Sequence, residues 1–477
     1  MKNQAYNPYL PSWEYCPDGE PYVYDGRLYV FGSHDAFNGK DFCQNDYVLW
    51  SCPVDDLSDW RMDGTIYSAK QDPAAKKNSF LQAPDVIQGP DGRFYLYYTL
   101  SLVPYMAAAV SDSLTGPYEY YGTIRLPNGH VLGGRNEIFQ FDPGLFRDDD
   151  GKYYLYSGFA PGSKGILGMF SKLYKMEGSY VMELGEDMLT LRSGPELIIP
   201  GVDVSEGTGF EGHEFYEASS MRKINGKYYF IYSSILSHEL CYAVSDHPDG
   251  GFRFGGTIVS ICDLGYKGQT WDMNYTGNTH GSLVKVQDQW YVFYHRQTNR
   301  NLFSRQGCAE PVHIDEEGRI AQAEVTSCGL NGGPLKGKGE YSAHIACNLT
   351  SRDGTYRYDR FLNRKWKDHP YLTQTGEDRQ DHPDQYIANM KDGAMAGFKY
   401  FDIGELERIG VQVSGSGRGE MLVKTSADGI TVCRIPVSAE GTRNWFESTC
   451  RIPRGIHALF FTYQGEGSIN FHRFELK

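Results

Sequence analysis

The sequence has no run of about 18 apolar residues, the length that a membrane-spanning helix requires. Its first residues, MKNQAYNPYLPSW, also lack the charged segment followed by an apolar segment that makes up a secretory signal peptide. We therefore expect a protein that neither spans a membrane nor is exported, and we expect to find it in the cytoplasm.

Paired cysteine motifs are also missing. None of the ten cysteines forms a CxxC pair or stands at metal-binding spacing from a histidine, so we expect reduced thiols rather than a disulfide framework.

Basic residues number 46 against 60 acidic ones, which gives a formal net charge of −14. A nucleic-acid partner would require clustered Lys and Arg, so the charge excludes one and favours a neutral substrate. The sequence leaves an oligomer open.

Aromatic residues and glycines are abundant instead. The chain of 477 residues contains 36 tyrosines and 55 glycines, a balance that favours many short strands joined by tight turns over long helices. A chain of this length is too long for one ordinary core. We expect an all-β protein with two domains.

Five segments share one design, in which a polar residue precedes an alternating apolar run, a turn and an aromatic strand. The segments are DGEPYVYDGRLYVFGS from Asp18, DVIQGPDGRFYLYYT from Asp85, DPGLFRDDDGKYYLYSG from Asp142, EASSMRKINGKYYFIYSS from Glu217 and HGSLVKVQDQWYVFYHR from His280. Each contains turn chemistry between two strand-like runs, namely Asp25-Gly26, Asp91-Gly92, Asp150-Gly151, Asn225-Gly226 and the weaker Gln287-Asp288. The segments predict five β-hairpins.

The second strands of these hairpins recur about every 60 to 75 residues, which leaves room for two further strands in each unit. This spacing predicts a five-bladed β-propeller, in which the first strand of each blade lines the central channel. The leading polar residues then occupy equivalent sites at one end of the channel. Asp18, Asp142 and Glu217 are the candidates for one shared pocket.

Carboxyl groups crowded at the neck of a channel repel one another, so that one tends to keep its proton while another stays ionised. Glycoside hydrolysis needs such a pair. One carboxyl protonates the leaving oxygen and the other activates a water molecule, and a separation of roughly 6.5 to 9.5 Å gives inversion of configuration. A third carboxyl can raise the pKa of the acid and orient the sugar.

The five hairpins, together with NPYLPSWEYCPDGEP near the N-terminus and QAPDV in the second unit, resemble glycoside hydrolase family 43 over about the first 325 residues. The resemblance implies an inverting exo-glycoside hydrolase that releases terminal β-D-xylose or α-L-arabinofuranose from short plant-type oligosaccharides. Alternatives on the same fold are an exo-galactofuranosidase and an arabinanase. A non-catalytic carbohydrate-binding protein is the alternative from another class.

By the same resemblance, Asp18 matches the general base, Asp142 the carboxylate that tunes and orients the acid, and Glu217 the general acid. Arg305 matches an arginine that reaches the substrate, and His280 matches an axial histidine beside a bound calcium ion or a water cluster.

Two departures from the family pattern leave rivals open. The base is usually followed by proline, whereas here Gly19-Glu20 follows Asp18, so Glu20 competes with it. Near the acid, Glu211 and Glu214 compete with Glu217, which the register of the repeat favours.

Sugar rings need apolar platforms, because aromatic faces stack on their C–H surfaces. Four aromatic residues in loops near the proposed pocket are candidates for this role: Trp13, Phe80, Phe159 and Trp271. Asp85 is a further candidate for substrate binding, with a structural role as its alternative.

The C-terminal third has a different pattern. We expect the propeller over residues 1–327, a Gly- and Lys-rich linker over 328–340 and a jelly-roll β-sandwich over 341–477. The blocks AGFKYFDIGELERIGVQVSGSGRGEMLVKTS and GIHALFFTYQGEGSINFHRFEL resemble carbohydrate-binding module family 6. Trp366, Tyr371 and Trp445 are its candidate stacking residues, and a contribution to the active-site rim or to an oligomer contact is the alternative role for this domain.

Overall fold

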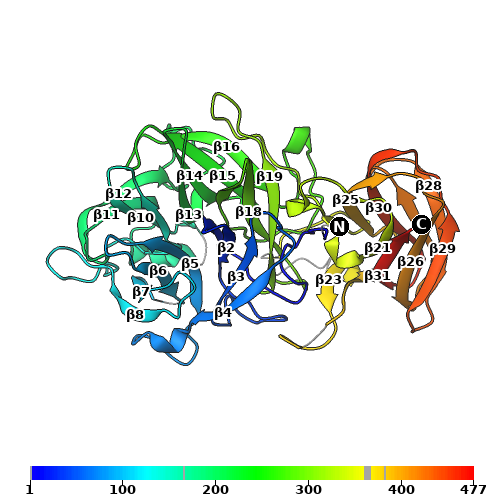
Figure 1. Ribbon diagram of the computed structural model, residues 1–477, viewed down its shortest axis with the longest axis horizontal. Helices are drawn as coiled ribbons and strands as arrows, with labels where there is room; N and C mark the ends of the chain where they lie inside the picture. Colours follow the sequence, from blue (N-terminus) through cyan, green and yellow to red (C-terminus); the bar gives the residue numbers. More distant parts are fainter. Residues whose placement is uncertain (1–2, 102, 165–166, 359–366, 381–382) are drawn as a thin grey trace.

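The computed structural model describes residues 3–101, 103–164, 167–358, 367–380 and 383–477 (Figure 1). Strands dominate this part of the chain, and the helices are short 3-10 turns: η1 (Ala69–Gln71), η2 (Leu167–Lys172), η3 (Tyr266–Gly268), η4 (Gly329–Asn331) and η5 (Ala343–Ile345). No helix in the described ranges has both the length and the apolar character that crossing a membrane takes. All ten cysteines are free, as the absence of paired motifs predicts.

Up to Val312, the described residues form five antiparallel sheets that follow one another along the chain, which confirms the predicted propeller. The first blade contains β1 (Glu20–Tyr24), β2 (Arg27–Phe31), β3 (Tyr47–Pro53) and β4 (Arg61–Tyr67). The second contains β5 (Leu81–Gln88), β6 (Phe94–Leu100), β7 (Met106–Ser111) and β8 (Glu119–Thr123). The third contains β9 (Gly144–Arg147), β10 (Tyr153–Ser157), β11 (Gly178–Leu184) and β12 (Leu191–Pro200).

The fourth blade contains β13 (Phe215–Ile224), β14 (Lys227–Ser234), β15 (Glu239–Ser245) and β16 (Arg253–Ser260). The fifth has three strands in the described residues, β17 (Leu283–Val286), β18 (Gln289–Gln297) and β19 (Arg305–Val312). The first strand of the first blade lies beside the first strand of the fifth blade, and a parallel bridge joins Gly19 to Gly281. The ring therefore closes around a central axis.

Successive side chains of the aromatic strands pack on opposite faces of the blade and so form the interfaces between blades. In β2, Leu28 and Val30 pack in a cluster shared with the fifth blade, whereas Tyr29 and Phe31 pack in a cluster shared with the second. Successive side chains of a strand point to opposite faces of its sheet, so each blade has two apolar faces, one for each neighbour. Similar clusters fill the other interfaces between neighbouring blades.

The sandwich consists of two sheets at the other end of the molecule, in the yellow to red part of Figure 1. One sheet has the order β20 (Leu335–Lys336), β25 (Met395–Ile403), β30 (Gly455–Glu466), β27 (Arg418–Lys424) and β28 (Thr431–Ser438), with β22 (Asn348–Thr350) also paired to β25. The other has the order β23 (Tyr371–Gln374), β24 (Gln385–Met390), β31 (Ile469–Leu476), β26 (Arg408–Gly415) and β29 (Asn444–Thr449), with β21 (Gly339–Ser342) also paired to β31. Their facing sides enclose one apolar core.

The segment expected as a linker is packed into both domains, because Leu330 is buried in the cluster between the first and fifth blades and the strands that follow it belong to the sandwich. Within 328–340, β20 pairs in parallel with β25 and the first residues of β21 pair with β31. Leu335 is fully buried in the sandwich core. The Gly- and Lys-rich composition of residues 328–340 matches that of flexible linkers. The segment is nevertheless fixed in place, because Leu335 is apolar and the edges of the two sheets offer free backbone groups.

Candidate active site

Asp18 and Asp142 occupy the same position in two blades. Each stands two residues before the inner strand of its blade, Asp18 before β1 and Asp142 before β9, and each has a left-handed backbone, with φ of 57° and 47°. Aspartate is among the few non-glycine residues that adopt this conformation readily. The matching geometry confirms that the repeat places the two residues equivalently.

A cavity of about 400 Å³ opens at this end of the channel. The predicted residues Asp18, Asp142, Phe159, Glu217, His280 and Arg305 all line it. Its other lining residues are Phe42, Cys43, Gln82, Ala83, Phe141, Tyr216, Ser237, Gly277, Asn278, Leu302 and Arg357. The rings of Phe141 and Tyr216 lie 5.1 and 5.3 Å from that of Phe159, so these three residues form an apolar wall opposite groups that are charged or polar.

Arg305 holds Asp18 in the ionised state. Its Nη1 donates to Asp18 Oδ1 at 2.9 Å, while Nε and Nη2 donate to the two carboxylate oxygens of Asp35 at 2.8 and 3.0 Å. All three side chains are buried. Although burial alone would raise it, the pKa of Asp18 lies well below its usual range, because Arg305 and two nearby histidines favour the charged form. Asp18 is therefore a carboxylate at neutral pH.

Two histidines flank Asp18. His295 Nδ1 accepts the backbone N–H of Asp18 at 3.3 Å, and its Nε2 lies 3.0 Å from the carbonyl oxygen of Asn278, to which it donates. His280 Nδ1 lies 3.5 Å from Asp142 Oδ2 and 4.0 Å from Asp18 Oδ1. Burial lowers the pKa of His280 to about 4, so this ring is neutral at neutral pH.

Glu217 has the opposite electrostatic environment from Asp18. Burial, followed by the negative charge of Asp18, raises the pKa of Glu217 to about 7, against the opposing effects of Arg305 and a hydrogen bond with Asn278. Below that pH Asp18 is ionised whereas Glu217 is protonated. This is the division that a general base and a general acid require.

Asp142 acts on the backbone beside Glu217. Its Oδ2 accepts the N–H of Ala218 at 3.2 Å, and Ala218 has a left-handed φ of 70°. Burial and the nearby Glu217 and Asp18 raise the pKa of Asp142 well above its usual range. The charge that raises the pKa of Glu217 comes from Asp18, whereas Asp142 contacts the backbone beside that glutamate.

The rival carboxylates do not line the pocket. Glu20 lies in β1 and pairs with Arg222 Nη2 at 2.8 Å, and Ser220 Oγ donates to the same glutamate oxygen at 3.2 Å. Glu211 is exposed in its loop, and Glu214 is buried beside Ser205. Asp18 and Glu217, which the register of the repeat favours, do line the pocket.

The structure does not bring Asp85 to the pocket. Asp85 precedes its turn residue Asp91 by six positions, whereas Asp142 precedes Asp150 by eight, so Asp85 lies farther along the channel. Its oxygens accept hydrogen bonds from Tyr22 Oη at 2.5 Å and from the backbone N–H of Leu145 at 2.6 Å. These bonds join three neighbouring inner strands, and the alternative structural role is the one that the contacts support.

Three of the predicted aromatic platforms also lie elsewhere. Trp13 packs edge-on against Trp50 with ring centroids 6.0 Å apart, in the cluster between the first and fifth blades. Phe80 immediately precedes β5, whose residues Gln82 and Ala83 line the pocket in its place. Trp271 lies in a separate hollow beside the sandwich. Proximity along the sequence did not reveal which way these loops turn.

Several site residues escaped the sequence analysis. Asp35 and His295 hold Asp18 and its arginine, and Asn278 bonds Glu217, but Asp35 and Asn278 belong to segments without a distinctive motif. Arg357 comes from beyond the propeller and forms a parallel bridge with Thr276, which precedes Gly277 of the pocket wall. The sandwich domain therefore contributes to the rim, and of these residues only His295, in the YHR of the fifth hairpin, stood within a segment already singled out.

His280 is the residue for which a calcium neighbour was expected. Its buried Nε2 has no hydrogen-bond partner among the described residues, so a water molecule or a hydrated cation fits that atom. Calcium prefers six to eight oxygen ligands. No group of three candidate ligand atoms within the described ranges includes His280, so an ion there would take its remaining ligands from water.

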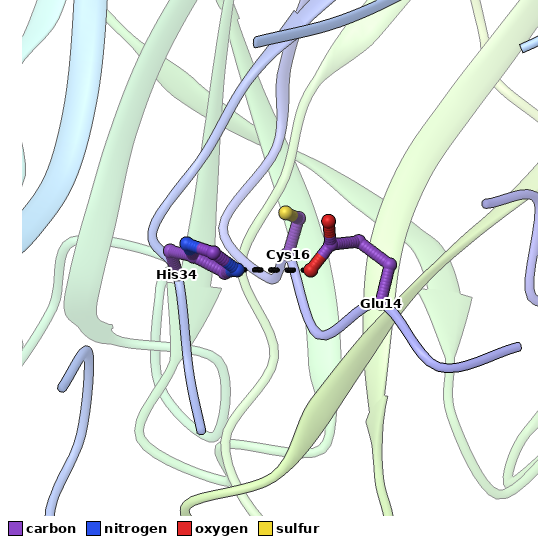
Figure 2. A group of neighbouring side chains, drawn as sticks. All are labelled: Glu14, Cys16 and His34. Carbon is purple, nitrogen blue, oxygen red and sulfur yellow. Dashed lines mark hydrogen bonds and ion pairs between the residues drawn. The ribbon is translucent and has the colours of Figure 1, made fainter. Parts of the chain in front are cut away.

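A second group of residues, of types that commonly bind metal ions, lies away from the pocket. Glu14, Cys16 and His34 point toward one another in Figure 2, and His34 Nε2 lies 2.9 Å from Glu14 Oε1. Arg379 of the sandwich donates to His34 Nε2 at 2.8 Å and to Glu14 Oε1 at 3.2 Å, while His34 Nδ1 donates to the Asp46 carbonyl at 2.8 Å. A guanidinium already occupies the position that a cation would take, so this group joins the two domains.

The fold and the site together define a glycoside hydrolase. A propeller pocket that contains an ionised carboxylate, a protonated carboxyl and an apolar wall is suited to acid–base cleavage of a glycosidic bond.

Comparisons with known proteins agree. Residues 17–320 match the model of glycosyl hydrolases family 43, and the chain belongs to this family. A xylosidase/arabinosidase from Thermoclostridium stercorarium is 49% identical over 484 residues, which cover 100% of this chain and 99% of that protein.

Solved structures share the fold. The complex of an arabinoxylan arabinofuranohydrolase from Bacillus subtilis with cellotetraose has a TM-score of 0.51 and 21% identity, covering 99% of this chain and 97% of that one. A β-xylosidase/α-arabinofuranosidase from a compost microbial metagenome, in a calcium-free complex with xylotriose, has a TM-score of 0.50 and 23% identity, covering 66% of this chain and 96% of that one.

Proposed function

We propose that this enzyme is an inverting exo-glycosidase that releases terminal β-D-xylose or α-L-arabinofuranose from plant-type oligosaccharides. The observation that carries the proposal is the opposite protonation of Asp18 and Glu217 in one pocket at the end of the channel. The similarity to a xylosidase/arabinosidase over the whole chain supports the choice of sugars.

The reaction follows from these two groups. Glu217 gives its proton to the glycosidic oxygen as the bond from that oxygen to the anomeric carbon breaks. Asp18 takes a proton from a water molecule, whose oxygen forms the new bond to the same carbon from the opposite face. Arg305 and Asp35 fix the orientation of Asp18, and proton exchange with solvent restores both carboxyl groups.

Leaving-group dependence tests the two roles separately. Glu217→Ala is expected to lower kcat several hundredfold on aryl glycosides with poor leaving groups and much less on 2,4-dinitrophenyl glycosides, whose leaving group needs no protonation. Asp18→Ala is expected to lower kcat strongly on both. Equal losses for Glu217→Ala on both substrates would contradict its assignment as the acid.

The sugar and the stereochemistry need their own measurements. A screen of aryl β-D-xylosides, α-L-arabinofuranosides and β-D-galactofuranosides identifies the glycon, and cleavage of linear arabinan would instead favour an arabinanase. NMR of the first product formed is expected to show the inverted anomer. Retention would overturn the mechanism, and no sugar release from any of these substrates would favour a binding protein.

We also propose that the buried Nε2 of His280 faces a hydrated calcium ion. The ion would order water beside Asp18 and Asp142 without entering the reaction. Calcium added to chelator-treated enzyme is expected to raise the Tm of the native protein but not that of His280→Ala. An equal rise in both proteins would place the ion elsewhere.

A further inference from the structure

A cleft lies where the propeller meets the sandwich, apart from the catalytic pocket. It consists of two adjoining hollows of about 330 and 730 Å³, which share the lining residues Trp271, Met273, Ala427 and Asp428. Trp271 and Met273 belong to the propeller, in the segment between η3 and β17, whereas Ala427 and Asp428 lie in the turn between β27 and β28 of the sandwich. Junctions between domains are frequent locations of ligand sites.

Trp271 is the feature of this cleft that packing does not explain. Its side chain is 58% exposed, although tryptophan is among the residues that bury the largest apolar area. Gln269 Nε2 donates to the carbonyl oxygen of Trp271 at 3.0 Å, which fixes the backbone of the loop. An exposed indole on a fixed backbone is a platform for a flat apolar surface.

The rest of the cleft is amphipathic. Met273, Ala458 and Phe460 form a buried apolar cluster at its base, and the exposed Ser426 and Asp428 stand at its edge. Sugars in a chain have the same division, because their C–H faces are apolar and their hydroxyl groups form a polar perimeter. The apolar part of the cleft can stack on the C–H faces, and its polar edge can form hydrogen bonds with the hydroxyl groups.

The charges in the smaller hollow disfavour an anionic ligand. Lys399 is already paired with Asp263 at 2.8 Å and with Glu324 at 3.0 Å, and Asp428 adds a further negative charge. The described lining of the smaller hollow therefore has more carboxylates than cations, which favours a neutral ligand over a phosphate or an acidic chain.

The cleft adjoins the catalytic pocket. Thr355 lines the larger hollow and Arg357 lines the pocket, and two residues of extended chain span about 7 Å between Cα atoms. A second connection runs from Met273 in the cleft to Gly277 in the pocket wall. A chain that leaves the pocket past Arg357 can therefore reach Trp271.

From these observations we propose that the cleft binds the remainder of the substrate, a neutral polysaccharide or long oligosaccharide chain whose terminal or branching sugar occupies the catalytic pocket. The proposal rests on the proposed function for the chemical class of its ligand. It assigns to the sandwich domain a share of substrate binding at the junction, with Trp271 as the stacking platform.

The experiment compares long and short substrates. The ratio of kcat/KM for soluble arabinoxylan to that for an aryl α-L-arabinofuranoside, or for xylohexaose to an aryl β-D-xyloside, depends on contacts beyond the pocket. Trp271→Ala is expected to lower this ratio about tenfold, which corresponds to about 1.4 kcal/mol. Ala427→Arg, which fills the cleft from the sandwich side, is expected to lower it as well and guards against a local effect of the tryptophan substitution.

Trp445→Ala is the matched comparison, because Trp445 is 43% exposed on β29, outside the cleft. If the ratio falls for Trp445→Ala and not for Trp271→Ala, the chain lies on the sandwich face and the proposal is wrong. An unchanged ratio in both cleft variants also overturns it. Failure of the proposed function is a separate outcome, since it removes activity on the aryl glycosides themselves.

Discussion

The proton on Glu217 sets the pH range of catalysis, because only the protonated form can serve as the acid. Its pKa of about 7 means that the active fraction falls about tenfold for each pH unit above that value. Asp18 has its pKa well below the usual range, so it stays ionised under mildly acidic conditions. We expect kcat/KM to fall above about pH 7 and to show no loss from Asp18 down to about pH 4. A profile of kcat/KM against pH measures both limits.

The matched control is Glu211→Gln. Glu211 lies in the loop before β13, the strand that contains Glu217, but it is exposed, and the amide oxygen of glutamine can still accept the N–H of Gly207. This variant is expected to keep the profile of the native enzyme. An alkaline limit that begins near pH 5 in the native enzyme would contradict the electrostatic environment described for Glu217.

Asp142 allows charge and hydrogen bonding to be separated. Asp142→Asn keeps an oxygen that can accept the N–H of Ala218, whereas Asp142→Ala removes it and frees the backbone beside Glu217. Misplacement of a catalytic group by about 1 Å can cost about 100-fold in rate. We expect kcat to fall about 100-fold for Asp142→Ala and about tenfold or less for Asp142→Asn. Equal losses would show that the carboxyl acts through its charge.

At the scale of strands and turns, the hairpins were predictable because their information is local. The five turns, from Asp25-Gly26 to Gln287-Asp288, each join the first two strands of a blade. The position of Asp85 was not predictable with the same precision, because a difference of two residues in hairpin length moves a side chain along the channel. Likewise, Trp13 and Trp271 lie in loops whose paths depend on packing between distant segments.

The N-terminal segment acts as an additional edge for the fifth blade. Tyr9 N donates to the Gly307 carbonyl at 3.1 Å. The buried amide of Asn7 accepts the N–H of Ala309 at 3.0 Å and donates to its carbonyl at 2.9 Å. Asn7 thus satisfies backbone groups of β19 that would otherwise be buried without partners.

Asn7→Ala is therefore expected to lower the free energy of unfolding by about 3 kcal/mol, since it leaves buried donors and acceptors unpaired. Urea denaturation measures the loss. Asn128→Ala, in an exposed turn where the side chain accepts a hydrogen bond from His130 N–H, is expected to cost about 0.5 kcal/mol. Similar losses for the two variants would mean that the N-terminal segment does not support the blade.

At the scale of the whole molecule, the sequence predicts two β domains but not how tightly they join. Composition marks 328–340 as a linker, yet Leu335 enters the sandwich core and Arg357 reaches the catalytic pocket. Contacts between domains pair residues far apart in the chain, such as Glu14 with Arg379, and a single sequence has no local pattern that records them. The propeller follows from repeated hairpins, whereas the junction depends on tertiary packing.

The junction contains a buried cation between two carboxylates. Lys399 of the sandwich pairs with Asp263 at 2.8 Å and with Glu324 at 3.0 Å, and its side chain is 6% exposed. Removal of one partner from a buried ion pair costs about 3 to 5 kcal/mol, because the remaining charges stay buried without compensation. Lys399→Met is therefore expected to lower the Tm and to separate the unfolding of the sandwich from that of the propeller in a calorimetric scan.

Two further variants decide whether the ion pairs cause this effect. Lys285→Met removes an exposed lysine of β17 and is expected to leave the Tm unchanged. Adding Asp263→Asn and Glu324→Gln to Lys399→Met neutralises the carboxylates and is expected to recover most of the lost stability, since the cost arises from uncompensated charge. If the combined variant unfolds at a lower temperature than Lys399→Met alone, the lysine stabilises the junction by packing, and the coupling between the domains is not electrostatic.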